Sequence, residues 1–523
     1  MANKYDVIII GSGFGGAVTA CRLAERGQKV LILERGRRWE PEDYPREPTD
    51  PWLYDQNNPE KHNGWLDFNS IGDAKMTVVT GAGVGGGSLV YANVSAIPPP
   101  EGFAEGWPPE IKYEDLLPYY KKAGEMLGVR TIPPNQLTKR FKLVQEAADR
   151  TGFGTRFGPL ELAINFDDNF DVNARPYSDD QTVYKPNQFG VMQGTCVHSG
   201  NCDVGCQVKA KNTLDLNYLA VAEQKGADIR PLHMARYIKP ENNGYRVGYD
   251  VIKDCRLITG RSETAERVIL AAGSLGSTEL LLRSRDQYKT LPNLSQFLGH
   301  DWSSNGDFLT PAIHQNRDVS MSEGPTITCG IDFLIDAYEN QRFTIEDGGG
   351  PNFLLNWAKA EKDRGGIVGR LIREMNELLQ GEEEHIMLWF ANGIDAANGR
   401  LYLRTPWIWP WYGKRLHLEW EIKESKKLFD TILKMHTLLA EKTGGKVIVS
   451  PLWKKYNLLV TPHPLGGCNM GECSAKGVVN HLGEVFGYPR LYVADGAIIP
   501  EAIGINPSRT IAALAERIVK FMS

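Results

Sequence analysis

The amino-terminal forty residues constrain the fold more than any other part of the chain. An apolar run rich in β-branched residues, residues 5–10, is followed at once by a glycine-rich segment (GSGFGG) at residues 11–16. The run predicts a strand that is buried on both faces. A helical pattern then continues to Gly27, and a second apolar run, residues 30–33, ends at Glu34. A strand, a glycine turn, a helix, a strand and a terminal acid in this order predict a dinucleotide-binding βαβ unit.

Each glycine of the first turn has a physical role in such a unit. Gly11 allows the tight turn, Gly13 lets the backbone approach a pyrophosphate, and Gly16 lets the helix pack closely on the strand. The helix N-terminus offers unpaired N–H groups to the phosphates. Glu34 is expected to accept hydrogen bonds from the ribose hydroxyls, which argues against NADP. Three further residues are assigned to the same surface: Phe14, Gly15 and Arg35.

A second glycine cluster follows a strand-like run at residues 76–79. Residues 80–88 (TGAGVGGGS) repeat the formal spacing of the first cluster at Gly81, Gly83 and Gly86. Only about ten residues separate the cluster from Pro98, so there is no room for a crossover helix, and no acid follows at the expected distance. We therefore expect a loop whose bare backbone lies against a flat or anionic ligand that is already bound.

Several segments together resemble one family. Residues 84–90 are similar to the flavin-contacting loop of the glucose–methanol–choline (GMC) oxidoreductases, and most of all to the cholesterol oxidases that hold FAD non-covalently. Residues 268–274, 461–468 and 491–507 resemble three further family segments. The resemblance runs from residue 5 to about 518 in the family's order and is weak over roughly 100–190 and 310–450.

The resemblance implies an α/β fold with two interleaved domains, as in p-hydroxybenzoate hydroxylase. A Rossmann-like FAD-binding domain is expected at residues 1–100, 190–310 and 455–523, and an α+β substrate domain at 101–189 and 311–454. FAD is the implied cofactor. The residues that the resemblance assigns to it are Gly81, Gly85, Gly86, Gly87, Ser88, Asn93, Ala272, Gly273, Asp495, Gly496, Asn506 and Pro507.

Oxidising an alcohol requires a group that takes the hydroxyl proton while hydride passes to flavin N5. His463 lies between two prolines in a stretch that cannot be regular helix, and the resemblance makes it the catalytic histidine. A structural histidine in a rigid turn is the alternative. Asn506 is implied as the second polar residue of the site, and a helix-capping role is its alternative.

The family also implies a carboxylate base, which a rough match assigns to Glu383. A solvated acidic turn at residues 381–384 is the alternative, and His385 is another polar group there. Tyr91 stands where the related cholesterol oxidases carry Asn, with Asn93 two positions further on. The electron acceptor, oxygen or another compound, is therefore left open.

Two features favour a hydrophobic, sterol-like alcohol as substrate. Apolar residues recur at helical spacing over residues 366–380, and residues 407–412 (WIWPWY) are unusually aromatic. Together they could form a lid or a surface in peripheral contact with a membrane; ordinary core packing is the alternative. The rival functions are GMC oxidation of terpenoid, long-chain or sugar alcohols, and a flavoprotein that does not turn over alcohols.

Composition narrows the remaining choices. The formal net charge of −5 argues against nucleic-acid binding, which needs a basic face. No signal peptide and no run of about 18 apolar residues is visible, so we expect a cytoplasmic protein. Cys196, Cys202 and Cys206 lie close to His198, but their spacing matches neither ferredoxin nor zinc-ribbon patterns, so no metal is expected.

Overall fold

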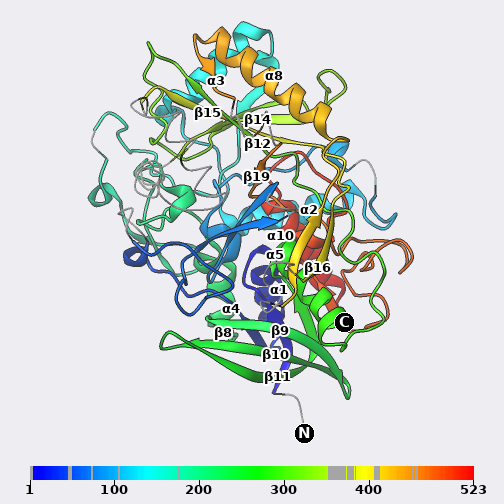
Figure 1. Cartoon of the computed structure of the whole chain (residues 1–523). Coiled ribbons are helices and arrows are strands. Elements are labelled where there is room, and N and C mark those ends of the chain that lie inside the picture. Colours follow the sequence, from blue (N-terminus) through cyan, green and yellow to red (C-terminus); the bar gives the residue numbers. More distant parts are fainter. Residues whose placement is uncertain are drawn as a thin grey trace.

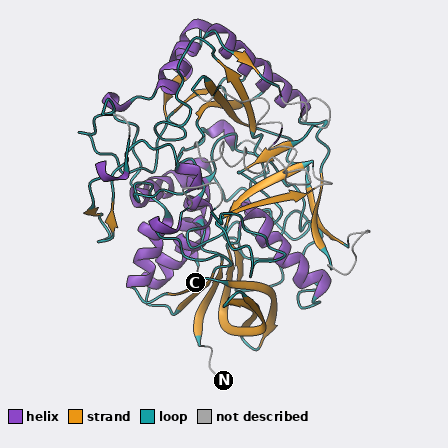
Figure 2. Ribbon diagram, turned by 60° about the vertical axis from the view of Figure 1, so that its left-hand side comes forward, coloured by secondary structure: helices purple, strands orange, loops and turns teal. Residues whose placement is uncertain are grey.

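The computed structural model of the chain describes residues 4–44, 50–71, 75–103, 106–174, 177–350, 373, 382, 384–405, 413–449, 453 and 457–522. Two large sheets dominate it. The strands β9 to β11 lie near the N-terminus, and the second sheet lies toward the opposite end beneath α3 and α8 (Figure 1). Loops, helices and smaller sheets fill the space between them (Figure 2).

The first large sheet has the order β8-β2-β1-β11-β10-β9, with β20 paired to β11. Its parallel strands are β8 (Asp228–Arg230), β2 (Val30–Leu33), β1 (Tyr5–Ile10), the second half of β11 (Arg256–Leu270) and β20 (Leu491–Val493). The first half of β11 continues into an antiparallel meander with β10 (Gly244–Lys253) and β9 (His233–Glu241). The central strands are buried on both faces, as their continuous apolar runs predict.

Four helices pack together beside this sheet: α1 (Phe14–Glu25), α2 (Tyr113–Leu127), α4 (Tyr218–Gln224) and α10 (Ser508–Phe521). Glu516 of α10 joins all four. Its carboxylate pairs with Arg22 of α1 and with Lys122 of α2, each at 2.7 Å, and it accepts a hydrogen bond from the Tyr218 hydroxyl of α4 at 3.0 Å. A fifth helix, α5 (Gly273–Leu282), begins directly after β11.

The second large sheet is antiparallel, with the order β18-β12-β15-β14-β13-β5. Its strands are β18 (Lys446–Val447), β12 (Phe308–Ile313), β15 (Ile386–Gly393), β14 (Phe343–Gly348), β13 (Cys329–Asp332) and β5 (Phe157–Pro159). Helices α3 (Lys139–Thr151) and α8 (Lys426–Lys442) pack on this sheet (Figure 1).

Three smaller sheets complete the described chain. In one of them β19 (Leu459–Thr461) runs parallel to β4 (Met76–Gly81), which pairs with β3 (Leu66–Ile71). The other two are the hairpins of β16 (Arg400–Arg404) with β17 (Arg415–Glu419) and of β6 (Lys185–Pro186) with β7 (Met192–Gln193).

The predicted α/β fold is confirmed, and so are the predicted strand, helix and strand at the N-terminus, which are β1, α1 and β2. The limits of the two interleaved domains stay a prediction. The apolar helical pattern at 366–380, apart from Arg373, and the aromatic run at 407–412 lie outside the described residues. Among the residues that are described, no helix is long and apolar enough to cross a membrane.

Candidate active site

The parallel strands of the first sheet deliver the predicted cofactor residues to one edge. Gly11 follows β1, Ala272 follows β11, and Asp495 lies two residues after β20. Because the strands are parallel, their carboxyl ends meet, which is where ligands bind in open α/β sheets. A cavity of about 1760 Å³ opens at this edge and is lined by all three residues.

The two glycine-rich loops touch each other at the floor of this cavity. A Cβ on Gly86 would lie 2.6 Å from Gly13 Cα, and one on Gly11 would lie 2.4 Å from the Ala271 oxygen. A Cβ on Gly15 would lie 1.8 Å from the Ala494 oxygen. No side chain fits at these positions, so the floor is bare backbone that a flat, anionic ligand can approach.

Glu34 lies in the cavity wall beside the first glycine loop. Its carboxylate accepts hydrogen bonds from Ser12 N at 3.0 Å, Ser12 Oγ at 2.6 Å and Gly36 N at 2.9 Å. Burial raises the pKa of this carboxyl group. The neighbouring Arg35 also lines the cavity and pairs with Asp67 at 2.9 Å.

Asp495 organises another part of the cofactor surface, next to Gly15 of the first glycine loop. Its carboxylate accepts hydrogen bonds from Gly273 N at 2.8 Å, Ser277 Oγ at 2.5 Å and Ala497 N at 2.9 Å. Burial raises the pKa of Asp495 to about 6. These bonds join the start of α5 to the segment after β20, so the cavity edge is held at fixed geometry.

Most of the predicted cofactor residues line the cavity. Those on its surface are Gly11, Gly13, Phe14, Gly15, Glu34, Arg35, Gly81, Gly86, Gly87, Ala272, Gly273, Asp495, Gly496, Asn506 and Pro507. Gly16, Gly85, Ser88 and Asn93 lie behind it and shape the loops; Ser88 Oγ, for example, donates to the Gly85 carbonyl at 2.7 Å. Cofactor contact at all of these positions, on the cavity surface or behind it, stays a prediction.

His463 lines the same cavity and is held by a buried carboxylate. Its Nδ1 lies 3.0 Å from Asp307 Oδ1, and its backbone N–H donates to Asp307 Oδ2 at 3.2 Å. Asn392 and Thr461 also donate to the Asp307 carboxylate, at 2.5 Å and 2.6 Å. A carboxylate at Nδ1 keeps the proton on that nitrogen and leaves Nε2 as an acceptor.

Strand pairing explains why His463 meets the glycine loop. His463 follows β19 and the second glycine loop follows β4, and these two strands are parallel. Their carboxyl ends therefore lie side by side.

Asn506, the second predicted catalytic residue, is positioned by the side chain of Asn305. This side chain makes hydrogen bonds to the backbone of residues 503–505, just before Asn506.

The structure adds a carboxyl group that the sequence reasoning missed. Asn506 Nδ2 donates to Glu346 Oε2 across 3.4 Å, while Glu346 Oε1 and Asn506 Oδ1 are buried without a partner. Burial raises the pKa of Glu346 to about 8. The sequence did offer one signal for Glu346: it is an acidic residue within the apolar run of residues 343–348. Unpaired buried oxygens of this kind fit a site that is completed by a ligand.

The other polar candidates have different surroundings. Glu383, the predicted carboxylate, lies outside the described residues. His385 is not part of the cavity lining, and its Nδ1 lies 2.9 Å from the Arg317 carbonyl. Tyr91 does line the cavity, with its hydroxyl donating to the Asn212 carbonyl at 3.0 Å.

One face of the second sheet forms an apolar wall around Glu346. Phe390 of β15 pairs with Leu309 of β12 and with Glu346 of β14, so all three side chains point to the same face. Leu388, two residues along β15, lies on that face as well. Leu309 is 49% exposed, and it lines the cavity together with Phe390 and Leu388.

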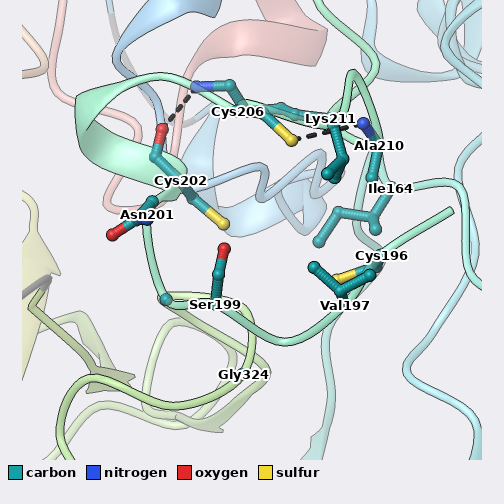
Figure 3. Close-up of a pocket in the computed structure, with 12 residues that line it drawn as sticks. Ile164, Cys196, Val197, Ser199, Asn201, Cys202, Cys206, Ala210, Lys211 and Gly324 are labelled. Carbon is teal, nitrogen blue, oxygen red and sulfur yellow. Dashed lines mark hydrogen bonds between the residues drawn. The ribbon is translucent and has the colours of Figure 1, made fainter. Parts of the chain in front are cut away.

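The three neighbouring cysteines enclose a separate small cavity. Cys196, Cys202 and Cys206 line a space of about 20 Å³ (Figure 3), which is room for about one water molecule. Cys206 Sγ accepts a hydrogen bond from Ala210 N at 3.2 Å. Within the described chain, no group of three or more His, Cys, Asp or Glu side chains is placed to hold a metal ion.

The residues at the large cavity fit FAD. The glycine floor, the α1 N-terminus and Glu34 match a dinucleotide, and the unpaired Asn506 oxygen lies where a flavin ring or an alcohol can complete its bonding. A fixed histidine beside such a surface is an arrangement that suits an FAD-dependent oxidoreductase acting on CH–OH groups.

Comparison with known proteins agrees with this class. A GMC oxidoreductase family model matches residues 413–515, and an NAD(P)-binding Rossmann-like domain matches residues 9–39. Cholesterol oxidases of Acinetobacter baumannii and Mycobacterium tuberculosis are each 31% identical over 99% of this chain, and the matches cover 94% and 91% of those proteins. The long-chain-alcohol oxidase FAO4B of Arabidopsis thaliana is 23% identical over 98% of this chain and 66% of its own length.

A solved structure shows the same fold. Pyridoxine 4-oxidase from Mesorbium loti superposes with a TM-score of 0.64 at 16% identity, with 99% of both chains covered. The chain belongs to the GMC oxidoreductase family. It is an FAD-dependent enzyme that oxidises an alcohol and passes the electrons to an acceptor.

Proposed function

We propose that the substrate is a bulky hydrophobic alcohol of sterol type. The apolar face formed by Leu309, Leu388 and Phe390 carries this proposal, because it lies in the same cavity as His463. A large apolar surface beside a few fixed polar groups is what a lipophilic ligand needs. The cholesterol oxidases at 31% identity support the same substrate class.

His463 is the group that takes the hydroxyl proton. Asp307 holds the Nδ1 proton, so Nε2 is the atom that accepts the proton of the substrate. Bound FAD supplies the hydride acceptor of the reaction. Asn506 orients the alcohol oxygen by donating one Nδ2 hydrogen to it, while the other Nδ2 hydrogen goes to Glu346.

Glu346 is a positioning residue in this scheme. With a pKa of about 8, its carboxyl group is mostly protonated at neutral pH, and its Oε2 receives the Asn506 amide. It thereby fixes which way the amide of Asn506 points, and it keeps the centre of the site uncharged. The carboxylate role predicted for Glu383 stays a prediction.

A substrate screen with flavin bleaching in the absence of oxygen tests the proposal. Sterols should reduce the bound flavin faster than glucose or choline. Leu309→Gln places an amide on the apolar face and should slow reduction by sterols roughly tenfold. Ile335→Gln is the matched control, because Ile335 is 53% exposed but does not line the cavity. A preference for glucose or choline, or equal effects of the two variants, contradicts the proposal.

A long-chain primary alcohol is the second candidate. The same apolar face would hold a linear chain. The similarity to the long-chain-alcohol oxidase FAO4B supports this second candidate. If the rate of flavin reduction rises with chain length among linear alcohols and exceeds the rate with every sterol tested, the long-chain alcohol is the substrate class.

A further inference from the structure

One stretch of chain, residues 86–94, runs along the wall of the large cavity from one end of the site to the other. At its start, a Cβ on Gly86 would lie 2.6 Å from a Cα of the first glycine loop. At its end, the Val94 carbonyl accepts a hydrogen bond from Ser508 Oγ at 3.0 Å, two residues after Asn506. A flavin that joins a pyrophosphate at the glycine loop to an alcohol at Asn506 would lie along this stretch, which we call the wall stretch. Its members that line the cavity are Gly86, Gly87, Val90, Tyr91, Ala92 and Val94.

Lys211 holds the wall stretch from its other side. Its ammonium group donates to the Leu89 carbonyl at 2.8 Å and lies 5.3 Å from the centre of the Tyr91 ring. The Tyr91 hydroxyl in turn donates to the carbonyl of Asn212, the residue after Lys211, at 3.0 Å. Lys211 lines the small cysteine cavity and not the large one (Figure 3), so the wall stretch lies between its charge and the large cavity.

The ammonium group of Lys211 is bonded only to uncharged oxygens. Its second hydrogen bond, of 2.5 Å, goes to the Cys202 carbonyl, and the Tyr91 carbonyl lies 3.5 Å away. The residue is 2% exposed, and it forms no ion pair with any residue that the structure describes. Asp203 and Asp215 are near enough to act on its charge, but neither is bonded to it. Acceptors on every side suit a charged amine, which has three N–H donors and no lone pair.

A cation in this setting is stabilised when negative charge comes close to it. Burial lowers the pKa of the Lys211 amine, because the charged form has lost its hydration. FAD brings its phosphate charges, and its flavin gains further electron density when it accepts hydride. Away from water the resulting attraction is stronger than in solution, so it favours the bound cofactor and favours the reduced form most.

We propose that the ammonium group of Lys211 is a charge that favours FAD at the wall stretch, and the reduced cofactor more than the oxidised one. A preference for the reduced cofactor is a higher reduction potential, which makes the bound FAD a better hydride acceptor. The inference goes beyond the choice of substrate, because it holds whichever alcohol is oxidised. Lys211 is a positioning residue, since it acts through the wall stretch.

Reduction potentials of the holoenzyme, measured against redox dyes without oxygen or substrate, test the inference. Lys211→Gln keeps hydrogen-bond donors but removes the charge, and Lys211→Arg keeps both. The potential of Lys211→Gln should fall by about 30 mV or more, which for two electrons is a tenfold change in the equilibrium between oxidised and reduced FAD. The potential of Lys211→Arg should stay close to that of the wild type.

A matched control and the FAD content separate the outcomes. Lys209→Gln removes a charge two residues away that is paired with Glu40 at 2.8 Å and does not line the large cavity, so its potential should not fall. Loss of FAD from Lys211→Gln with retention by Lys211→Arg also supports the inference, because the charge separates these two variants. A wild-type potential in Lys211→Gln, or an equal fall in Lys209→Gln, overturns it. Loss of FAD from Lys211→Arg, or a fall in its potential equal to that of Lys211→Gln, overturns it as well, since the charge is then not the cause.

Discussion

At the scale of single residues, Asp307 decides which nitrogen of His463 is free. Asp307→Asn replaces a side chain that only accepts hydrogen bonds with one that can also donate, so the imidazole can take the wrong tautomer. We expect flavin reduction by the alcohol to slow roughly ten- to hundredfold, which is less than the full 10²–10⁴-fold of general-base catalysis because the imidazole is still present. Rapid mixing without oxygen measures this rate, and the absorbance of bound FAD checks that the site is intact. An unchanged rate would remove Asp307 from the mechanism.

A second prediction concerns Glu346 and the way in which the stability of the protein depends on pH. Burial raises its pKa from the ordinary value of 4.5 to about 8, so folding favours its protonated form. The stability that this preference contributes is fully present below pH 4.5 and is lost as the pH rises toward 8. Glu346→Gln cannot ionise and should gain thermal stability relative to the wild type as the pH rises from 5 to 9. Thermal melts across this range test it, and a difference that shrinks with rising pH is the contrary result.

The residues of the site differ in how far sequence could predict them. His463 and Asn506 lie in short segments whose prolines and glycines restrict the backbone, so their roles could be proposed from local pattern. Glu346 could not, because its contact with Asn506 depends on the pairing of β14 with β15 and on a loop 160 residues further along the chain.

At the scale of elements, the contact between the two glycine loops should be sensitive to one methyl group. Gly86 has φ +52°, and its added Cβ would lie 2.6 Å from Gly13 Cα. Gly86→Ala should therefore push the loops apart and reduce FAD retention, as measured by the flavin-to-protein absorbance ratio. Gly158→Ala is the matched control, because no atom lies within 4 Å of the position of its Cβ. Equal FAD content in both variants would show that the loop contact is not needed.

Sequence patterns predicted the first sheet better than the second. Strand β1, helix α1 and strand β2 follow one another closely and have clear periodicities, so their order predicts their pairing. The six-stranded sheet draws its strands from residues 157 to 447: β13, β14 and β15 pair in chain order, but β5, β12 and β18 join them from distant parts of the chain. Pairing over such distances has no local signal, and the region had little family resemblance.

At the scale of the whole molecule, the cavity lies between the two large sheets, and FAD would fill much of it. A ligand that binds only the native state stabilises it by about 2.7 kcal/mol at a concentration of one hundred times its Kd. We expect removal of FAD to lower the melting temperature, and re-addition to restore it in a concentration-dependent way. A melting temperature that does not depend on FAD would contradict the assignment of this cavity. The domain limits, cytoplasmic location and membrane contact stay predictions.

The measurement that tests the central claim most directly is a single turnover by His463→Ala without oxygen. The variant should bind FAD as the wild type does, because His463 is not one of the backbone positions that form the glycine floor, but its flavin should be reduced by the alcohol roughly 10²–10⁴-fold more slowly. His463→Asn should keep part of the rate, since an amide still orients the hydroxyl. Reduction of the flavin in His463→Ala at the wild-type rate would contradict the claim that this histidine takes the proton.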